Sequence, residues 1–296
     1  MILVTGATGQ LGRVVIDHLL EQGHAGQVAA LVRDEGKAAD LKAKGVDVRV
    51  GEYDDVASLD GAMKGAEQVL LISGTEMDAA KSLRQHANVV DAAKRAGVRF
   101  IAYTGRAMRD PSATETELMR GHFKTEDLIR ESGMTYALFR NALYLESITY
   151  FIGKGRSHPG QQATFETDIR LPTDHGKVAY ALRIELGEGI ANALHQDRGE
   201  DRVYTLTAGE AWSFDDVAQA LGELSGKPVT YTPTDKATFD AQMRERGVPE
   251  AMARVFYGFY CDIRDGQLDE VPPELEGLLG RKPASLKAGL KALFNL

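Results

Sequence analysis

The amino-acid sequence predicts an α/β protein with a doubly wound parallel sheet and a smaller, mostly helical C-terminal domain. Short apolar runs alternate with helical patterns, and each run is nearly continuously apolar, as buried parallel strands are. The first strand-to-helix turn is rich in glycine. A chain of 296 residues that is 43% hydrophobic and 26% charged can bury a sizeable core. Together these features indicate a Rossmann fold.

The first strand and the turn after it predict a phosphate site. Ile2–Val4 is a short apolar run, Thr5 ends it, and a helix with one apolar face follows from residue 13. Glycine lets the backbone turn tightly and lets a pyrophosphate approach the N–H groups, and the helix N-terminus adds partial positive charge. The alternative is an ordinary strand-to-helix turn, which this context disfavours. We expect cofactor contacts from Gly6, Ala7, Thr8, Gly9, Gln10, Leu11 and Gly12.

The end of the second predicted strand, residues 28–32, favours NADP (NADPH) over NAD as the cofactor. Dinucleotide folds often carry an acidic residue about 20 positions past the glycines, where it holds the adenosine ribose. Arg33 occupies that place here, with Asp34 beside it and Lys37 nearby. A guanidinium at this point pairs with a 2′-phosphate. The alternative is a solvated charge at a strand end.

The next elements continue the alternation and bring small residues to the strand ends. Helices are expected at residues 37–44, 56–63 and 79–96, and strands at 46–50, 68–72 and 98–103. Carboxylates at Asp54 and Asp55 either lie near an adenine or cap the following helix. Ligands bind beyond the carboxyl ends of strands in such sheets. We therefore expect the cofactor to contact Ser73, Gly74, Thr104 and Gly105.

The second half of the chain begins regularly and then loses its pattern. A polar loop at 106–116, a helix at 118–131 and a sixth strand at 135–139 come first. A loop with a short strand is expected at 153–172, a helix at 176–194, strands at 203–206 and 228–232, and mostly helix thereafter. We assign 1–140 and about 176–207 to a cofactor-binding domain. Residues 141–175 and 208–296 are assigned to a substrate-binding domain.

Composition argues against several classes of partner and site. The formal net charge of −8 argues against nucleic acid, and no apolar run approaches the ~20 residues of a membrane span. Cys261 is the single cysteine, which excludes an internal disulfide. The chain starts directly with a strand and loop, so the cytoplasm is the expected location. No metal is expected, because His158, His175 and His195 lack the spacing of metal ligands.

Several motifs resemble the atypical short-chain dehydrogenases of the NmrA-like group. The glycine motif at residues 5–12 carries the first likeness. Further stretches look like the NAD(P)H:quinone oxidoreductase and triphenylmethane reductase subgroup, namely 70–74, 85–90, 92–98, 101–105, 138–144 and 280–286. The likeness is poor from about Ser147 to Asp201. The resemblance implies that this region shapes the substrate pocket.

The family comparison also indicates an unusual catalytic helix. Typical short-chain dehydrogenases use a Tyr-x-x-x-Lys pair, in which the phenol protonates a carbonyl oxygen as hydride arrives. Leu118 and His122 stand at these positions here, while Tyr150 and Lys154 have the spacing but fall after the sixth strand. The His122 imidazole would orient the nicotinamide ribose or relay a proton. The alternative is a helix histidine with a structural hydrogen bond.

The remaining candidate pocket residues are Tyr103, Asn141 and Tyr144. With His122 they form the expected catalytic set, and His122, Tyr103 and Asn141 are also expected to contact the cofactor. Each tyrosine has the alternative of a core or rim aromatic.

Two functions follow from these residues and from the resemblance. The first is an NAD(P)H-dependent reductase, a monomer or homodimer, that transfers hydride to a quinone or dye-like small molecule without a Tyr–Lys acid pair. The second is a non-catalytic NADP-binding redox sensor of the NmrA type.

Overall fold

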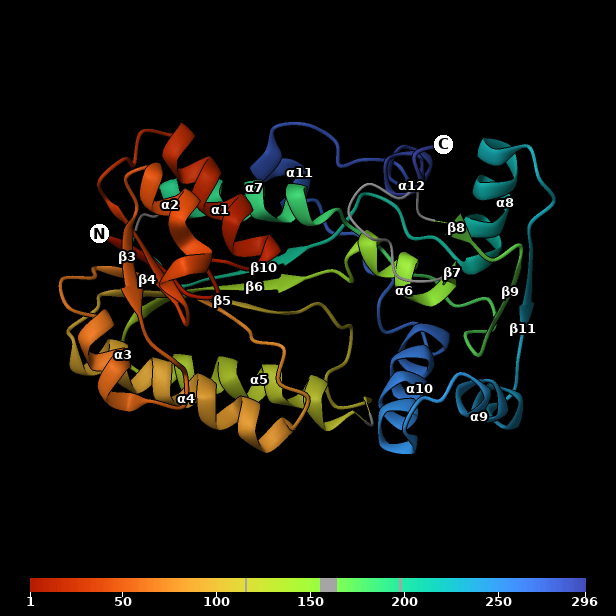
Figure 1. Ribbon diagram of the computed structural model, residues 1–296, viewed down its shortest axis with the longest axis horizontal. Coiled ribbons are helices and arrows are strands. Elements are labelled where there is room, and N and C mark those ends of the chain that lie inside the picture. The colour runs from red at the N-terminus through yellow and green to blue at the C-terminus, as the bar shows by residue number, and fades with distance from the viewer. Residues whose placement is uncertain (115, 155–163, 197–198) are drawn as a thin grey trace.

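The computed structural model describes residues 1–114, 116–154, 164–196 and 199–296. Its main feature is a seven-stranded parallel sheet (Figure 1). The strand order is β10-β6-β5-β4-β1-β2-β3, so the direction of winding reverses between β1 and β4. This confirms the predicted doubly wound sheet, and in such sheets ligands bind at the switch point. The strands are β1 (Ile2–Val4), β2 (Val28–Val32), β3 (Asp47–Val50), β4 (Gln68–Ile72), β5 (Phe100–Arg106), β6 (Thr135–Asn141) and β10 (Arg202–Leu206).

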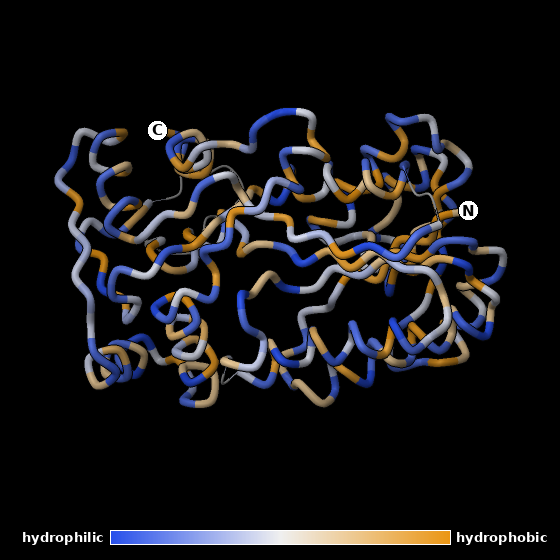
Figure 2. Tube along the Cα trace, turned by 180° about the vertical axis from the view of Figure 1, so that it is seen from behind, coloured by the Kyte–Doolittle hydropathy of each residue, from blue (hydrophilic) through white to orange (hydrophobic). Residues whose placement is uncertain are grey.

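Helices cover both faces of the sheet (Figure 1). One face carries α1 (Gln10–Glu21), η1 (Glu35–Ala38), α2 (Ala39–Ala43), α7 (Arg183–His195) and α11 (Glu274–Leu279), and the other carries α3 (Val56–Ala62), α4 (Ala79–Arg95) and α5 (Glu117–Arg130). Successive strand residues point to opposite faces of the sheet. Ile2 and Val4 accordingly belong to one apolar cluster, and Leu3 belongs to another. Figure 2 shows the apolar residues gathered along these strands. Burial on both faces explains why β1 and β2 are continuously apolar, whereas the edge strands β3 and β10 are more exposed and carry charged residues.

Helices α1 and α7 pack closely against each other. A Cβ at Gly187 of α7 would lie 2.4 Å from Cγ1 of Val14 in α1. Glycine therefore permits this contact, and the contact joins the helix after the glycine loop to the segment that leads into β10.

The remaining elements surround a third apolar cluster, which includes Tyr180, Phe214, Phe239 and Phe294. They are η2 (Leu145–Ser147), α6 (Ile148–Ile152), β7 (Gly153–Lys154), β8 (Thr164–Phe165), β9 (Asp168–Leu171), α8 (Phe214–Ser225), β11 (Thr230–Pro233), α9 (Lys236–Glu245), α10 (Glu250–Arg264) and α12 (Leu286–Phe294). The C-terminal part is helical, as expected. None of the described helices is both long and apolar enough to span a bilayer.

One predicted helix is wrong at its start. The segment 176–182 is extended, and α7 begins only at Arg183. Val178 exchanges backbone hydrogen bonds with Trp212, with both N···O distances at 2.9 Å. Gly176 lies so close to α10 that a Cβ there would be 2.2 Å from the Ile263 carbonyl oxygen. These contacts with distant segments override the local helical pattern.

The stretch 153–172 also differs from the expected loop with one short strand. It contains β7, β8 and β9, of which β7 and β8 form a small antiparallel pair and β9 pairs with β11. Residues 155–163, including His158, lie outside the described residues. The division into two domains stays a prediction.

Candidate active site

The glycine loop connects β1 to α1 at the switch point of the sheet. Gly6 has a φ of +57°, which side-chain-bearing residues rarely adopt. A Cβ at Gly12 would lie 2.5 Å from the Gly6 carbonyl oxygen, so only glycine lets α1 begin this close to the turn. Gly9 is the N-cap and has no side chain, so no side chain at this position caps the first turn. The first N–H groups of α1 therefore point out of the helix with partial positive charge, as an anion site requires.

Hydrogen bonds join the strand ends around this loop. The hydroxyl of Thr5 accepts from Ile72 N at 2.9 Å, and that of Thr104 accepts from Ser73 N at 3.1 Å. The Tyr53 hydroxyl lies 2.5 Å from Thr5 Oγ1 and 2.8 Å from the Ile72 carbonyl oxygen. The ends of β1, β4 and β5 thus form one connected edge, which includes the predicted residues Ser73 and Thr104.

Tyr53 is a contact that sequence reasoning missed. The prediction considered the carboxylates after β3, whereas the tyrosine beside them reaches the edge. Asp55 instead caps α3 by accepting from Ser58 N at 3.1 Å, as one of the two alternatives proposed. Asp54 accepts from Gln85 Nε2 at 2.6 Å.

Arg33 lies exposed directly after β2, as its sequence position predicted. The neighbouring Asp34 accepts from Gly36 N at 2.9 Å and caps η1. Among the described residues, Arg33 forms no ion pair within 4.0 Å. The arrangement therefore leaves its guanidinium available to a phosphate while the adjacent carboxylate is bound to the backbone.

Tyr103 and His122 come together between β5 and α5. The Tyr103 hydroxyl lies 2.7 Å from His122 Nδ1, although the two were singled out for separate reasons. Tyr103 is fully buried, and burial raises the pKa of its phenol. Burial also lowers the pKa of His122 to about 3, with smaller contributions from His86 and Arg106. At neutral pH both groups are therefore neutral, and we assign the tautomer in which the phenol donates to Nδ1 and the imidazole carries its hydrogen on Nε2.

A second histidine lies behind this pair. His86 packs edge-on against the Tyr103 ring, with the ring centroids 5.4 Å apart. Its Nδ1 lies 3.0 Å from Thr125 Oγ1, and that hydroxyl donates to the Gly121 carbonyl oxygen. His86 therefore donates from Nδ1, and burial lowers its pKa to about 4. Sequence reasoning did not single out His86, because a histidine on a long helix has no distinguishing local signal.

Asn141 and Tyr144 lie at the end of the sixth strand and just beyond it, as the sequence predicted. Asn141 is the last residue of β6 and is 3% exposed, and apart from the Tyr144 phenol its amide has no hydrogen-bond partner among the described residues. The guanidinium of Arg183 stacks on the Tyr144 ring at 4.3 Å from the centroid and contacts the Gln10 side chain in the glycine loop. Arg183 N donates to Glu146 Oε1 at 3.0 Å. Tyr144 is thereby fixed between the loop and the start of α7.

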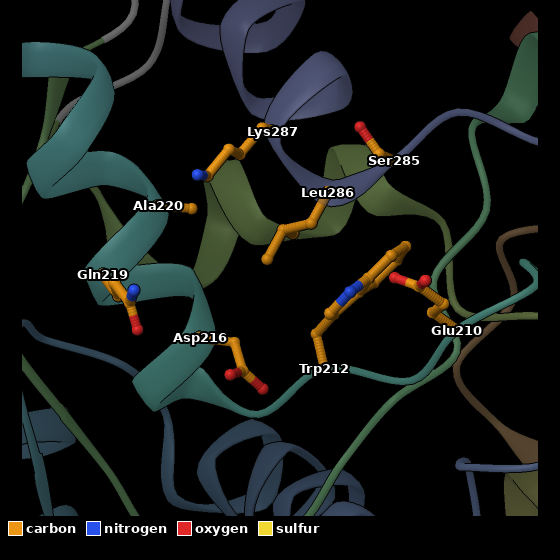
Figure 3. Close-up of a pocket in the computed structure, with 8 residues that line it drawn as sticks. All are labelled: Glu210, Trp212, Asp216, Gln219, Ala220, Ser285, Leu286 and Lys287. Atoms are coloured by element: carbon orange, nitrogen blue, oxygen red, sulfur yellow. The ribbon is translucent and has the colours of Figure 1, made fainter.

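A separate hollow of about 280 Å³ lies in the C-terminal part, between α8 and the start of α12 (Figure 3). Trp212 and Leu286 are among the residues that line it, and Glu210 lies beside the indole. None of the predicted site residues lines it. Within the described ranges, no group of three or more His, Cys, Asp or Glu side chains has the arrangement of a metal site.

Comparison with known proteins gives consistent results. The model of the NmrA-like family matches residues 1–278. Quinone oxidoreductase 2 of Escherichia coli K12 is 35% identical over 297 residues, which cover 100% of this chain and 99% of that protein. The Citrobacter sp. triphenylmethane reductase complexed with NADP(H) has a TM-score of 0.88 at 36% identity, covering 99% of this chain and 100% of the other. The E. coli NADPH-dependent quinone oxidoreductase complexed with NADPH has a TM-score of 0.88 at 34% identity, with full coverage of both chains.

Proposed function

The chain belongs to the NmrA-like family, and on that premise we propose that it is an NAD(P)H-dependent reductase of quinones or similar conjugated electrophiles. Two similar structures hold NADPH or NADP(H), and the related proteins are named for quinone and triphenylmethane reduction. Full-length coverage supports the proposal, because both parts of the chain have counterparts in those proteins.

The glycine loop fits a dinucleotide. Its first helical N–H groups and the close approach at Gly12 suit a pyrophosphate, and Arg33 suits a 2′-phosphate. Ser73, Gly74, Thr104 and Gly105 would border the cofactor from the neighbouring strand ends. When bound, the cofactor supplies a hydride. NADPH is the proposed form, with NADH as the alternative.

The Tyr103–His122 hydrogen bond is the observation that carries the chemistry. Burial keeps the imidazole neutral and the hydrogen bond fixes its position, so with the phenol as donor His122 offers Nε2–H as a hydrogen-bond donor beside the cofactor and not an acidic proton. An acceptor that takes hydride with little help from a protein acid is then required. Quinones and triarylmethane cations meet that requirement, whereas simple ketones do not.

Steady-state assays of NADPH oxidation test the proposal. The protein is incubated with 1,4-benzoquinone, with malachite green and with a simple ketone such as cyclohexanone. We expect turnover with at least one of the first two and none with the ketone. NADP and NADPH affinities that differ, with no turnover of any acceptor, would support the redox-sensor alternative. The cytoplasmic location and the monomeric or homodimeric state remain predictions.

A further inference from the structure

Arg106 is a partly buried cation at the end of β5, where the sequence analysis expected the start of a polar loop. It is the last residue of β5 and stands in register opposite Asn141 of β6. Its Nε atom is buried and has no hydrogen-bond partner within the described part of the chain. In the ranges that the structure describes, no carboxylate forms an ion pair with it. A guanidinium so placed has donor capacity that the protein itself does not use.

Other unpartnered polar atoms lie around the same strand ends. Among the described residues, the buried hydroxyls of Tyr180 and Thr207 have no hydrogen-bond partner, and the buried Asn141 amide has only the Tyr144 phenol beside it. Thr207 directly follows β10, whose last residue pairs with Asn141. Such groups are costly to bury unless a ligand or water completes them. Their grouping with Arg106 indicates a polar subsite next to the cofactor edge.

The pKa shifts of Arg106 and His122 show which groups interact electrostatically with Arg106. It contributes to the low pKa of His122, so its field reaches the cofactor side. Tyr144, Tyr180 and Asp262 oppose the lowering of its own pKa by burial, so these groups also lie within its electrostatic reach. Asp262 is 6% exposed and accepts from Thr114 Oγ1 at 3.2 Å. Arg106 therefore interacts electrostatically both with His122 of α5 and with Asp262 of α10.

We propose that Arg106 binds the acceptor's carbonyl oxygen and selects neutral, oxygen-bearing acceptors such as quinones over cationic triarylmethane dyes. This inference rests on the proposed reductase function. A fixed cation in a partly dehydrated site attracts an oxygen that becomes negative and repels a cationic ligand. The same residue thus favours one acceptor class and disfavours the other.

The charge balance of the reaction explains the direction of the effect. The C–H bond of the dihydronicotinamide breaks, and its hydride forms a new bond to the quinone, which is reduced while the nicotinamide is oxidised. The quinone leaves this step as a hydroquinone monoanion, whose oxygen takes a proton from water. A triarylmethane cation becomes neutral when it accepts the same hydride. Only the quinone gains an anion for Arg106 to stabilise.

Substitution of Arg106 with two acceptors tests the inference. The ratio of kcat/KM for 1,4-benzoquinone to kcat/KM for malachite green is measured in the wild type, Arg106→Gln and Arg106→Lys. We expect the ratio to fall at least tenfold in Arg106→Gln and to be largely kept in Arg106→Lys. Arg109→Gln is the matched control, because Arg109 is exposed and pairs with Asp269 at 2.6 Å. This control should leave the ratio unchanged.

An inhibitor measurement covers the case in which Arg106→Gln folds poorly. In the wild type, 4-nitrophenolate should inhibit NADPH oxidation at least tenfold more strongly than nitrobenzene, and Arg106→Lys should keep that preference. Equal inhibition by the two compounds, or an unchanged acceptor ratio in a folded Arg106→Gln protein, overturns the inference. Absence of turnover with every acceptor in the wild type would overturn the proposed function itself.

Discussion

Replacement of Gly12 by alanine tests whether the glycine loop is built for close approach. The new Cβ would lie 2.5 Å from the Gly6 carbonyl oxygen and 2.9 Å from the Ala7 Cα, and both are backbone atoms. Because backbone cannot rotate away as a side chain can, α1 has to shift. Forced overpacking of this kind costs about 1–3 kcal/mol in the free energy of unfolding. The shift also moves the N–H groups that we assign to the pyrophosphate.

Gly61→Ala provides the matched control. Gly61 lies in α3, and a Cβ there would meet nothing within 4 Å. Both substitutions gain helix propensity, so alanine at Gly61 should stabilise the protein by about 0.5–1 kcal/mol. The difference between the two variants then isolates the strain at the loop. Urea denaturation gives the free energies, and titration with NADPH gives the dissociation constants.

We expect Gly12→Ala to unfold at lower urea concentration than Gly61→Ala and to bind NADPH at least tenfold more weakly. Loss of one well-aligned hydrogen bond to a charged phosphate, worth about 1.5–3 kcal/mol, is enough for that change in affinity. The assignment of the loop is refuted if Gly12→Ala binds NADPH as tightly as the wild type. Equal stability of the two variants would refute the steric reasoning.

Three further predictions concern other parts of the site. Arg33→Ala should reduce the preference for NADPH over NADH about tenfold or more. An unchanged ratio of the KM values for NADPH and NADH would show that Arg33 is only a solvated charge at the strand end. Tyr103→Phe should lower kcat several-fold, because it removes the phenol that holds His122 Nδ1. The Kd for NADPH should stay within threefold of the wild type, and a tenfold weaker Kd would contradict this positioning role. The pKa values of His86 and His122, about 4 and about 3, lie below the usual 6.5, so the unfolded chain binds more protons in mild acid. The contribution of the two neutral imidazoles to the free energy of unfolding should be fully present above about pH 6.5. It should fall towards pH 4 by about 1.4 kcal/mol per pH unit for each imidazole. If chemical denaturation of a His86→Gln variant gave an equally steep dependence of this free energy on pH, the prediction would be contradicted.

The sheet could be predicted because its information is local. Residues 28–32 and 68–72 form strands with the predicted bounds, since burial on both faces demands a continuous apolar run. The start of α7 could not be predicted in the same way. Gly176 and Val178 are extended because of contacts with Ile263 and Trp212, and the pattern of a single segment does not contain those contacts.

The candidate site also has residues that local sequence predicts and residues that only tertiary packing reveals. The glycine loop and Arg33 were found because a dinucleotide fold fixes their spacing from the first strand. Tyr103 and His122 were named separately, and only the packing of α5 on β5 shows that they form one hydrogen-bonded pair. Arg106 was missed because charge after a strand suggests a solvated loop. Its buried Nε becomes evident only once β5 is seen to extend to that residue.

The place of β10 in the sheet has a consequence for how the chain folds as it is synthesised. β10 covers the free edge of β6 with parallel pairs from Arg202–Ala137 to Leu206–Asn141. The ribosome must therefore make residues 142–201 before that edge can close, which takes on the order of several seconds at typical elongation rates. During this interval β6 presents unpaired backbone groups to other chains. Translation speed across this stretch should thus affect the yield of folded protein, with rapid pairing of β10 limiting aggregation of the nascent chain.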